Sequence, residues 1–468
     1  MTTAIWWIRR DLRLSDNPAL MKALESAGQV IPVFILDPHL LNSPFVGEKR
    51  LAFLYEGLRK LDHELKKRGS YLVLRQGDPV QVFTKLASQY PYNSIYVEEN
   101  YSPYAHSRDE RIRNSFGYQT AGSTAIVPPY GLLKSDGTPY RIFTPYSRIW
   151  KSTLDREPPQ ITPAPEQIPT PPGIESLQVP TKPSQAASIP FQAGENCAQL
   201  ALRAFMDGPE AKIFEYERNR NRMDMDGTAG ISPYLRFGML SARQAAIDAL
   251  EASAYAATPE ARKSASVWLN ELAWRDFYIQ ILFHYPNVLK ESFRANNISW
   301  EEDAVSFSAW CQGKTGYPIV DAGMRQLLQS GWMHNRARMI TASFLTKDLL
   351  IDWRQGQKWF MQHLIDGDPA SNNGGWQWTA GTGTDAAPYF RIFNPITQGK
   401  RFDPQGSYIR RWVAELARVP DEYIHEPWKM PGELQLQTGF VPGKTYPLPI
   451  VEHNWARQRA LSAFKRGR

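Results

Sequence analysis

The chain has 468 residues, of which 42% are hydrophobic and 22% charged, with 54 Lys and Arg against 47 Asp and Glu. This length exceeds what one hydrophobic core usually serves, so we expect two or more domains in a globular protein. The net charge of +7 is modest and favours an anionic partner without requiring one. No run of residues is long and apolar enough for a membrane-spanning helix, so we expect no membrane partner.

The cysteine count and the N-terminal residues indicate in which cellular compartment the protein is expected. Cys197 and Cys311 are too few for a disulfide framework or a metal cluster. The chain opens with the strand-like run 3–8, which lacks the cleavage pattern of a signal peptide. The eight histidines show no metal-ligand spacing, and the Asp366–Asp368 segment lacks the later ligands of a calcium loop. We therefore expect a cytoplasmic protein that holds no metal.

The first third of the chain alternates strand and helix patterns. One helix is predicted from Pro18 to about Gly28 with Asp16 as its cap. Strand, helix, strand at this spacing predicts a parallel sheet, which binds ligands beyond its strand ends. The glycine patterns of dinucleotide-binding folds and P-loops are missing from the sequence, so the ligand stays open. The predicted strands are Ile5–Ile8, Val30–Leu36, Tyr71–Arg75 and Ser94–Val97, and a further helix is predicted at Pro79–Gln89.

Proline is abundant between Glu157 and Pro190, a composition that resists regular structure and is typical of a long connector. From about Cys197 onward the patterns are helical. The fold class predicted is α/β plus all-α. We predict an α/β domain at residues 1–130, a proline-rich connector at 131–195 and a helical domain at 196–468.

The helical part concentrates Arg, Asn, Asp and Trp. On a helix near Trp268–Phe283, Glu271, Trp274 and Arg275 share one face, which predicts either a surface ion pair or the lining of a ligand cavity. Asn335, Arg338 and Met339 likewise share a face. Asp366 and Asp368 suit ribose hydroxyls or an imide N–H as acceptors, or else they cap the following helix.

A second segment, 226–235, places Gly, Thr and Ser residues just before a helix. Backbone N–H groups and hydroxyls in such a segment can bind a phosphate, and a capped helix start is the equal alternative. Arg218, Arg220 and Arg222 alternate nearby, which predicts either a basic ridge for nucleic-acid phosphates or a solvated run of charge.

Together these segments resemble the photolyase/cryptochrome family, most closely the class I cyclobutane pyrimidine dimer photolyases of microbes. The resemblance runs from Arg9–Asn17 through Glu271–Tyr278 and Lys314–Ala322 to Phe393–Pro395. It implies a Rossmann-like antenna domain, an interdomain connector and a helical domain that holds FAD. The implied activity is light-driven repair of pyrimidine dimers in DNA by an electron from excited, reduced FAD.

The resemblance also implies roles for particular residues. Asn335 would face flavin N5, Arg338 would pair with Asp366, and Ala229 stands where a serine is common. Three tryptophans, Trp300, Trp353 and Trp376, would relay electrons to the flavin, although core packing alone would also explain them. The implied FAD contacts are Tyr216, Thr228, Ala229, Gly230, Ile231, Ser232, Trp268, Arg275, Asn335, Arg338, Asp366, Gly367 and Asp368.

A lesion pocket is implied for a dinucleotide flipped out of the helix, as base-repair enzymes require. Glu271 would hydrogen-bond a thymine and stabilise its radical anion. The implied pocket residues are Glu271, Trp274, Asn335, Arg336, Met339 and Trp378. The implied contacts to phosphate or backbone are Arg220, Arg336, Arg391, Gln398 and Arg401. The expected partner is damaged DNA, with duplex preferred, bound by a monomer that is nucleoid-associated when on DNA and needs no obligate protein partner.

Two alternatives stay open beside dimer repair. A cryptochrome-type blue-light receptor would share fold and flavin, and enzymes for (6-4) photoproducts carry a histidine pair where this chain has His334 and Asn335. Asn335, Met339 and Trp378 favour dimer repair. For a second chromophore, near Asp37 and Arg9–Arg10, we keep folate, 8-hydroxydeazaflavin, a second flavin and an empty site open.

Overall fold

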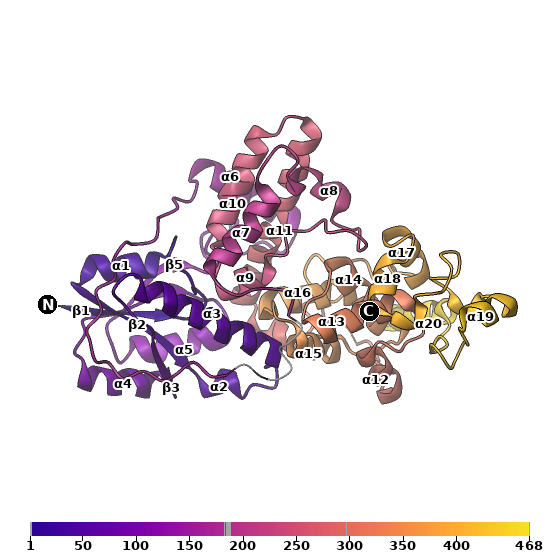
Figure 1. Ribbon diagram of the computed structural model, residues 1–468, viewed down its shortest axis with the longest axis horizontal. Coiled ribbons are helices and arrows are strands. Elements are labelled where there is room, and N and C mark those ends of the chain that lie inside the picture. Colours follow the sequence, from indigo (N-terminus) through magenta and orange to yellow (C-terminus); the bar gives the residue numbers. More distant parts are fainter. Residues whose placement is uncertain (1, 182, 184–188, 296, 468) are drawn as a thin grey trace. The chain divides into compact units, whose positions relative to one another are not determined.

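The computed structural model describes residues 2–181, 183, 189–295 and 297–467. The chain forms two compact units (Figure 1). Unit 1 comprises Met1–Glu217, Ala229–Pro286 and Ile365–Ala370, and unit 2 comprises Arg218–Thr228, Asn287–Leu364 and Ser371–Arg468. The three domain ranges inferred from sequence stay a prediction, and residues 182 and 184–188 of the connector lie outside the described residues.

A parallel sheet of five strands, in the order β3-β2-β1-β4-β5, forms the N-terminal part of unit 1. The predicted parallel sheet and the predicted fold class are thereby confirmed, with a helical remainder of the chain. The sequence did not indicate β5, which is a partly exposed edge strand without an apolar run. The strands are β1 (Thr3–Ile8), β2 (Gln29–Leu36), β3 (Val73–Gln76), β4 (Ile95–Glu99) and β5 (Tyr118–Ser123).

Helices make up most of the rest of both units. In unit 1, α6, α7, α10 and α11 run beside one another (Figure 1). The helices of unit 1 are α1 (Pro18–Ser26), α2 (Pro38–Leu41), α3 (Glu48–Lys66), α4 (Pro79–Gln89), α5 (Pro103–Arg113), α6 (Phe143–Arg156), α7 (Glu195–Met206), α9 (Ser232–Phe237), α10 (Ala242–Tyr255) and α11 (Pro259–His284). The short α8 (Tyr216–Asn219) spans the boundary between the units.

Unit 2 is built around α13, most of whose side chains are buried. Its centre also contains a π-helix, Phe344–Asp348. The helices of this unit are α12 (Ala304–Gln312), α13 (Pro318–Ser330), α14 (Asn335–Ser343), α15 (Trp353–His363), α16 (Pro369–Ala380), α17 (Pro395–Phe402), α18 (Ser407–Trp412), α19 (Gly432–Thr438) and α20 (His453–Arg466), with the first residues of α16 in unit 1. Among the described residues, no helix has both the length and the apolar character needed to cross a bilayer.

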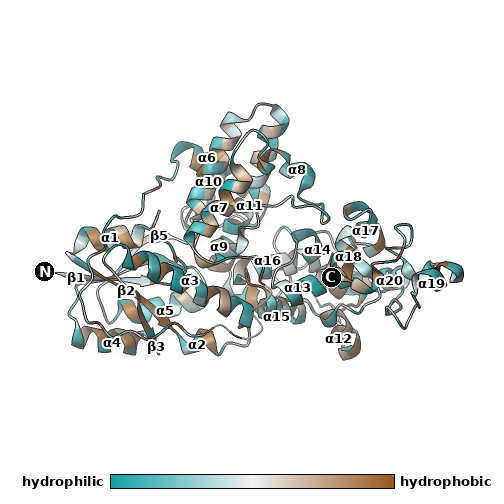
Figure 2. Ribbon diagram, viewed as in Figure 1, coloured by the Kyte–Doolittle hydropathy of each residue, from teal (hydrophilic) through white to brown (hydrophobic). Residues whose placement is uncertain are grey.

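The sheet core follows the two-residue period of a β-strand. Alternate residues of β1 and β2, such as Ile5 and Trp7 or Ile31 and Val33, belong to one buried cluster. Phe83 of α4 covers this face, and its ring meets Trp7 edge to face with centroids 5.0 Å apart. The helix α3 buries residues such as Phe53, Leu58 and Leu61, and its charged residues are teal in Figure 2. This division is expected for a helix that packs through one apolar stripe.

The cap of α1 differs from the prediction. Asn17, not Asp16, accepts the N–H of Leu20, at 3.0 Å. Asp16 has a positive φ of 47°, which turns its carboxylate toward α10, where it pairs with Arg243 at 2.8 Å and accepts the hydroxyl of Ser241. Asp16 therefore ties the start of α1 to α10, and capping falls to the next residue.

The described part of the connector contains no helix or strand between α6 and α7, as its proline content predicted. It is not loose, because its backbone pairs with the sheet. Val30 donates its N–H to the carbonyl of Pro169 at 2.7 Å, and Leu177 donates to Leu74 of the edge strand β3 at 3.0 Å. This pairing covers an edge that would otherwise be open to other chains.

Gly238 ends α9 in the left-handed region, with φ 63°, and lies against the backbone after β1. A Cβ at this position would overlap the carbonyl oxygen of Arg10. Only glycine therefore fits both the dihedral angle and the space.

Gly238→Ala should lower the free energy of unfolding by about 2–4 kcal/mol, because alanine adds about 1 kcal/mol of left-handed strain and about 1–3 kcal/mol of overpacking. Gly69→Ala is the matched control, since Gly69 has φ 74° and nothing lies within 4 Å of its added Cβ. Denaturant unfolding of both variants would measure the difference, and equal losses would contradict the close approach of Gly238 to Arg10.

Candidate functional site

The site residues inferred from sequence occur in both units, and each set is described by itself. In unit 1 they are Tyr216, Ala229, Gly230, Ile231, Ser232, Trp268, Glu271, Trp274, Arg275, Asp366, Gly367 and Asp368. In unit 2 they are Arg220, Thr228, Trp300, Asn335, Arg336, Arg338, Met339, Trp353, Trp376, Trp378, Arg391, Gln398 and Arg401. The predicted Arg338–Asp366 pair joins the two sets and stays a prediction.

In unit 1, the loop Ile365–Ala370 is held by α9. Ser232, the first residue of α9, donates its hydroxyl to Asp366 Oδ2 at 2.7 Å. One turn later, Arg236 Nε donates to the carbonyl of Gly367 at 2.7 Å. The helix start and the loop, about 130 positions apart in the sequence, therefore form one polar surface.

Asp368 has two kinds of partner. Its Oδ1 accepts the N–H of Ala370 at 3.0 Å, which caps the start of α16. Its Oδ2 forms an ion pair with Arg10 at 2.9 Å. Arg10 also donates its Nε to the carbonyl of Arg236 at 3.0 Å, which links the end of β1 to α9 and the loop.

Burial makes the charged form of three arginines in this region of unit 1 less favourable. Desolvation lowers the pKa of Arg10 to about 9, with Arg236 and Arg275 adding repulsion and Asp368 opposing it. Desolvation likewise lowers the pKa of Arg236 to about 10 and that of Arg50 to about 10. A buried guanidinium is stabilised by a nearby anion. The donor set therefore suits an anionic ligand.

The helix α11 presents the predicted aromatic face. Trp274 stacks on Phe143 with ring centroids 3.6 Å apart and planes at 5°, so one face of its indole is already covered. Arg275 pairs with the fully buried Asp276 at 3.1 Å. Asp276 also accepts the indole N–H of Trp150, which fixes this turn of α11 against α6. Tyr216 and Trp268 both lie on Phe205, with centroids 6.0 Å and 5.7 Å from it.

In unit 2, α14 carries the predicted Asn335, Arg338 and Met339 face. Asn335 is exposed at the first helical position, and its amide nitrogen lies 3.9 Å from the Met339 sulfur. Arg338 donates its Nε to the carbonyl of Met333 at 2.8 Å. His334, which the sequence did not single out as a cap, accepts the N–H of Arg336 at Nδ1 and orients this helix start.

Three predicted phosphate ligands converge in unit 2. Arg336 donates a hydrogen bond from Nη2 to Asn221 Oδ1 at 2.6 Å. Its guanidinium carbon lies 4.4 Å from the centroid of the Phe402 ring. Arg401 lies 5.1 Å from the same ring. Burial, and then repulsion from Arg220 and Arg401, lowers the pKa of Arg336 to about 10. The cluster of Arg220, Arg336 and Arg401 is thus a concentrated cationic surface.

The two remaining residues predicted to contact phosphate or the DNA backbone are Gln398 and Arg391. Gln398, on α17, has a buried Oε1 without a hydrogen-bond donor among the described residues. Arg391 is exposed in the segment between α16 and α17.

The three relay tryptophans lie in unit 2. Trp353 and Trp376 are 0% and 2% exposed, and a Cβ on Gly356 of α15 would overlap the Trp376 indole. Trp300 is half-buried and meets Phe464 of α20 edge to face, with centroids 5.9 Å apart. The indole N–H groups of Trp353 and Trp376 have no acceptor among the described residues.

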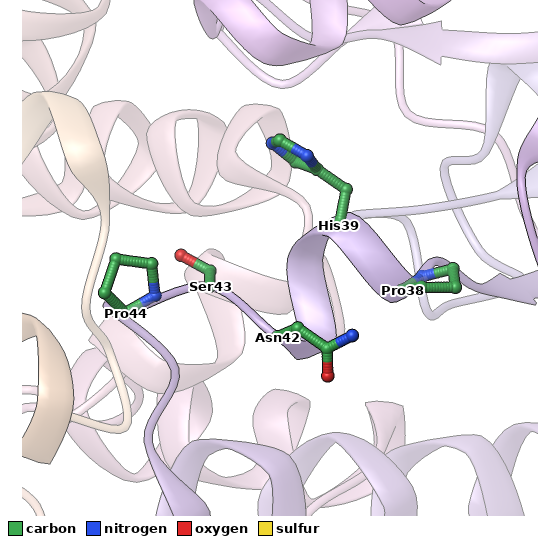
Figure 3. Close-up of a pocket in the computed structure, with 5 residues that line it drawn as sticks. All are labelled: Pro38, His39, Asn42, Ser43 and Pro44. Atoms are coloured by element: carbon green, nitrogen blue, oxygen red, sulfur yellow. The ribbon is translucent and has the colours of Figure 1, made fainter.

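A separate pocket of about 410 Å³ lies after β2 in unit 1 (Figure 3). It is lined by Pro38, His39, Asn42, Ser43 and Pro44, from α2 and the loop that follows. The His39 ring stacks on Tyr104 with centroids 4.3 Å apart, and Tyr104 donates its hydroxyl to Asp37. The carboxyl ends of parallel strands are the usual place for such a pocket.

The chain is similar to DNA photolyases over nearly its whole length. Residues 4–169 match the family described as DNA photolyase, and residues 268–466 match the FAD binding domain of DNA photolyase. A deoxyribodipyrimidine photo-lyase of Synechococcus is 40% identical over 98% of this chain and 96% of that protein.

Solved structures show the same similarity. A bacterial class III photolyase from Agrobacterium tumefaciens has a TM-score of 0.91 and 38% identity, over 100% of this chain and 98% of that one. A Synechocystis cryptochrome has a TM-score of 0.87 and 31% identity, over 99% of both chains.

His334 should make unit 2 sensitive to acid. Burial, and then repulsion from Arg336 and Arg338, lowers its pKa to about 4. In the unfolded chain the pKa is about 6.5, so the stability contributed by neutral His334 is present above pH 6.5 and lost as pH falls toward 4.

Between pH 8 and pH 5 this loss should be about 2 kcal/mol. His334→Asn retains a capping side chain that does not titrate, so its free energy of unfolding should fall by about 2 kcal/mol less over that interval. Denaturant unfolding at both pH values measures the difference, and the same pH dependence in variant and parent would refute this role of His334.

Proposed function

The chain belongs to the photolyase/cryptochrome family, and on that premise we propose that it repairs cyclobutane pyrimidine dimers in DNA with light and FAD. The names of its relatives support the reaction, and the match to the FAD binding domain of DNA photolyase supports the cofactor. The observation that carries the proposal is on α14, where the exposed Asn335 directly precedes Arg336 and its arginine cluster. One helix start would thus contact both flavin and DNA.

Membership of class I is a finer proposal. It rests on the motifs Glu271–Tyr278 and Lys314–Ala322 and on their resemblance to class I enzymes. The similar Agrobacterium tumefaciens photolyase is of class III. Light-driven dimer repair is the activity proposed under either class.

For FAD, we propose that α9 and the Ile365–Ala370 loop hold the cofactor in unit 1. The buried guanidinium groups there suit its anionic groups, and the carboxylates of Asp366 and Asp368 suit its hydroxyls and imide N–H. When bound and reduced, FAD supplies the photoexcited electron that opens the cyclobutane ring and then returns. Asn335 and Arg338 on α14 are the proposed contacts from unit 2.

For the lesion, we propose that Trp274 offers a base the face of its indole that Phe143 does not cover. In its protonated form, Glu271, one turn before Trp274, would donate a hydrogen bond to a thymine carbonyl and stabilise the negative charge that develops there. Met339 and Trp378 are the proposed apolar contacts from unit 2. The chemistry requires no nucleophile, because the protein's task is orientation and exclusion of water.

For DNA binding, we propose that the cluster of Arg220, Arg336 and Arg401 contacts phosphates, with Arg391 and Gln398 beside the backbone. Arg336 is held by Asn221 and Phe402, so little side-chain entropy remains to be lost on binding. Binding through phosphates releases counterions, so the affinity should fall with added salt.

We also propose that Trp376, Trp353 and Trp300 relay electrons to oxidised flavin. Because the inner indoles have no acceptor for their N–H groups, an oxidised Trp376 or Trp353 retains its proton and remains easily re-reduced by the next indole. Trp300 is half-buried, so charge that reaches it can leave to solvent. This difference in burial directs the relay outward.

A second chromophore is proposed for the pocket beside His39 (Figure 3). Its volume of about 410 Å³ suits a flat cofactor, and His39, backed by Tyr104, offers a ring to stack on. Extraction of the protein and absorption spectroscopy would distinguish a folate, a deazaflavin, a flavin and an empty pocket.

A cryptochrome-type photoreceptor is the second candidate, favoured by the similarity to the Synechocystis cryptochrome. The arginine cluster and the face of Trp274 that Phe143 does not cover favour repair, because a receptor that signals to a protein needs neither.

Glu271→Ala should reduce dimer repair about 10- to 150-fold, because the charged hydrogen bond lost is worth about 1.5–3 kcal/mol, and flavin should stay bound. The assay illuminates reduced protein anaerobically with an oligonucleotide that carries one thymine dimer and follows the repaired strand by chromatography. A dark reaction and a (6-4) oligonucleotide test the reaction type.

Glu260→Ala, at the exposed start of the same helix, is the control and should repair normally. Full repair by Glu271→Ala would refute the role of Glu271. No repair by the parent protein with its flavin bound would refute the proposed function and leave the receptor.

Trp353→Phe should block photoreduction of oxidised flavin in the presence of an external reductant, but spare repair by protein that is already reduced. Trp359→Phe, on the same helix α15 but outside the proposed relay, should photoreduce normally. Absorption at the flavin bands during illumination measures both variants. Equal photoreduction in the two would remove Trp353 from the relay.

A further inference from the structure

The two arginines after β1 have separate partners. Arg9 binds Asp109 at 2.7 Å and the carbonyl of Glu98, both within the α/β part of unit 1. Arg10 binds Asp368 at 2.9 Å and the carbonyl of Arg236 at 3.0 Å. Only Arg10 therefore reaches the loop proposed to hold flavin.

Arg10 belongs to a buried set of interacting charges. The guanidinium groups of Arg10, Arg50 and Arg236 interact with the carboxylates of Asp366 and Asp368. Arg275 is paired with Asp276. The side chains of Arg10 and Asp368 are only 15% and 14% exposed, so water screens their charges weakly.

Resting on the proposed function, we propose that Arg10 is a positioning residue that holds Asp368 toward the flavin and raises the flavin's reduction potential. Two consequences of its geometry support this. The ion pair orients the Asp368 carboxylate, whose other oxygen is already engaged by Ala370. The positive charge of Arg10 offsets the negative charge of Asp368 and so favours the anionic, fully reduced flavin over forms with one electron fewer.

A purely structural role for Arg10 predicts something different. Loss of the ion pair would then lower stability and leave the electrochemistry of bound flavin unchanged. The ion pair of Arg243 with Asp16, at 2.8 Å, provides the comparison, because it is similarly buried in unit 1 and lies between α1 and α10. Arg243→Gln should destabilise the protein without shifting the potential.

The experiment measures the reduction potential of bound FAD by anaerobic titration in the parent protein, Arg10→Gln, Arg10→Lys and Arg243→Gln. Arg10→Gln should favour the more oxidised form about tenfold, a shift of about 59 mV to more negative potential for a one-electron couple. Arg10→Lys keeps the charge and should recover most of the shift. Arg243→Gln should match the parent.

An unchanged potential in Arg10→Gln would overturn the inference, as would an equal shift in Arg243→Gln. If Arg10→Gln retains no flavin, Arg50→Gln serves in its place, because Arg50 is a buried cation that interacts with Asp366 of the same loop. It should shift the potential in the same direction, and an unchanged potential there would also overturn the inference. Dimer repair by the parent protein is scored separately, so failure of the proposed function is distinguishable from failure of the role of Arg10.

Discussion

The buried contact between guanidinium groups and the Ile365–Ala370 loop is the constraint on which unit 1 depends. A loop remote in sequence is held by Ser232 and Arg236 from α9 and by Arg10 from the end of β1. Gly238 lets α9 approach Arg10 closely enough for these bonds. Desolvated arginines are unfavourable by themselves, and the anionic cofactor proposed for this region would offset part of that cost. The fold and the proposed cofactor would thus meet one electrostatic requirement.

Unit 2 combines an apolar core that contains the tryptophans with a cluster of arginines at the edge of that core. Its tryptophans are packed in an apolar core where the inner indole N–H groups lack acceptors, while its arginines gather at Phe402 on the edge of that core. The dry core suits movement of electrons, because a charge formed there is neither hydrated nor deprotonated at once. The cationic edge suits a polyanion. His334 caps the start of α14, the helix that carries Asn335 and the Arg336 of this cationic edge.

Helices and strands with a regular hydrophobic spacing could be predicted from the sequence, whereas contacts between residues remote in sequence could not. The helix Pro79–Gln89 and the strand Val30–Leu36 were recovered because buried faces impose regular spacing. Asp16 was assigned as a cap because local patterns cannot show that α10 attracts its carboxylate. Arg10, Asn221 and His334 were missed as supports for the same reason: each acts on a partner remote in sequence or through a backbone bond. Most functional residues were identified by resemblance to a family, since lone Trp and Arg residues also occur in ordinary cores and surfaces.

In the proposed reaction, bound, reduced FAD gives its excited electron to a pyrimidine dimer. The first measurement to make is therefore the excited-state lifetime of the reduced flavin, under anaerobic conditions, with and without DNA. We expect an oligonucleotide with one cyclobutane dimer to shorten the lifetime, and the same oligonucleotide without the dimer to leave it unchanged. A lifetime that ignores the dimer while the damaged strand is bound would contradict electron transfer from flavin to lesion.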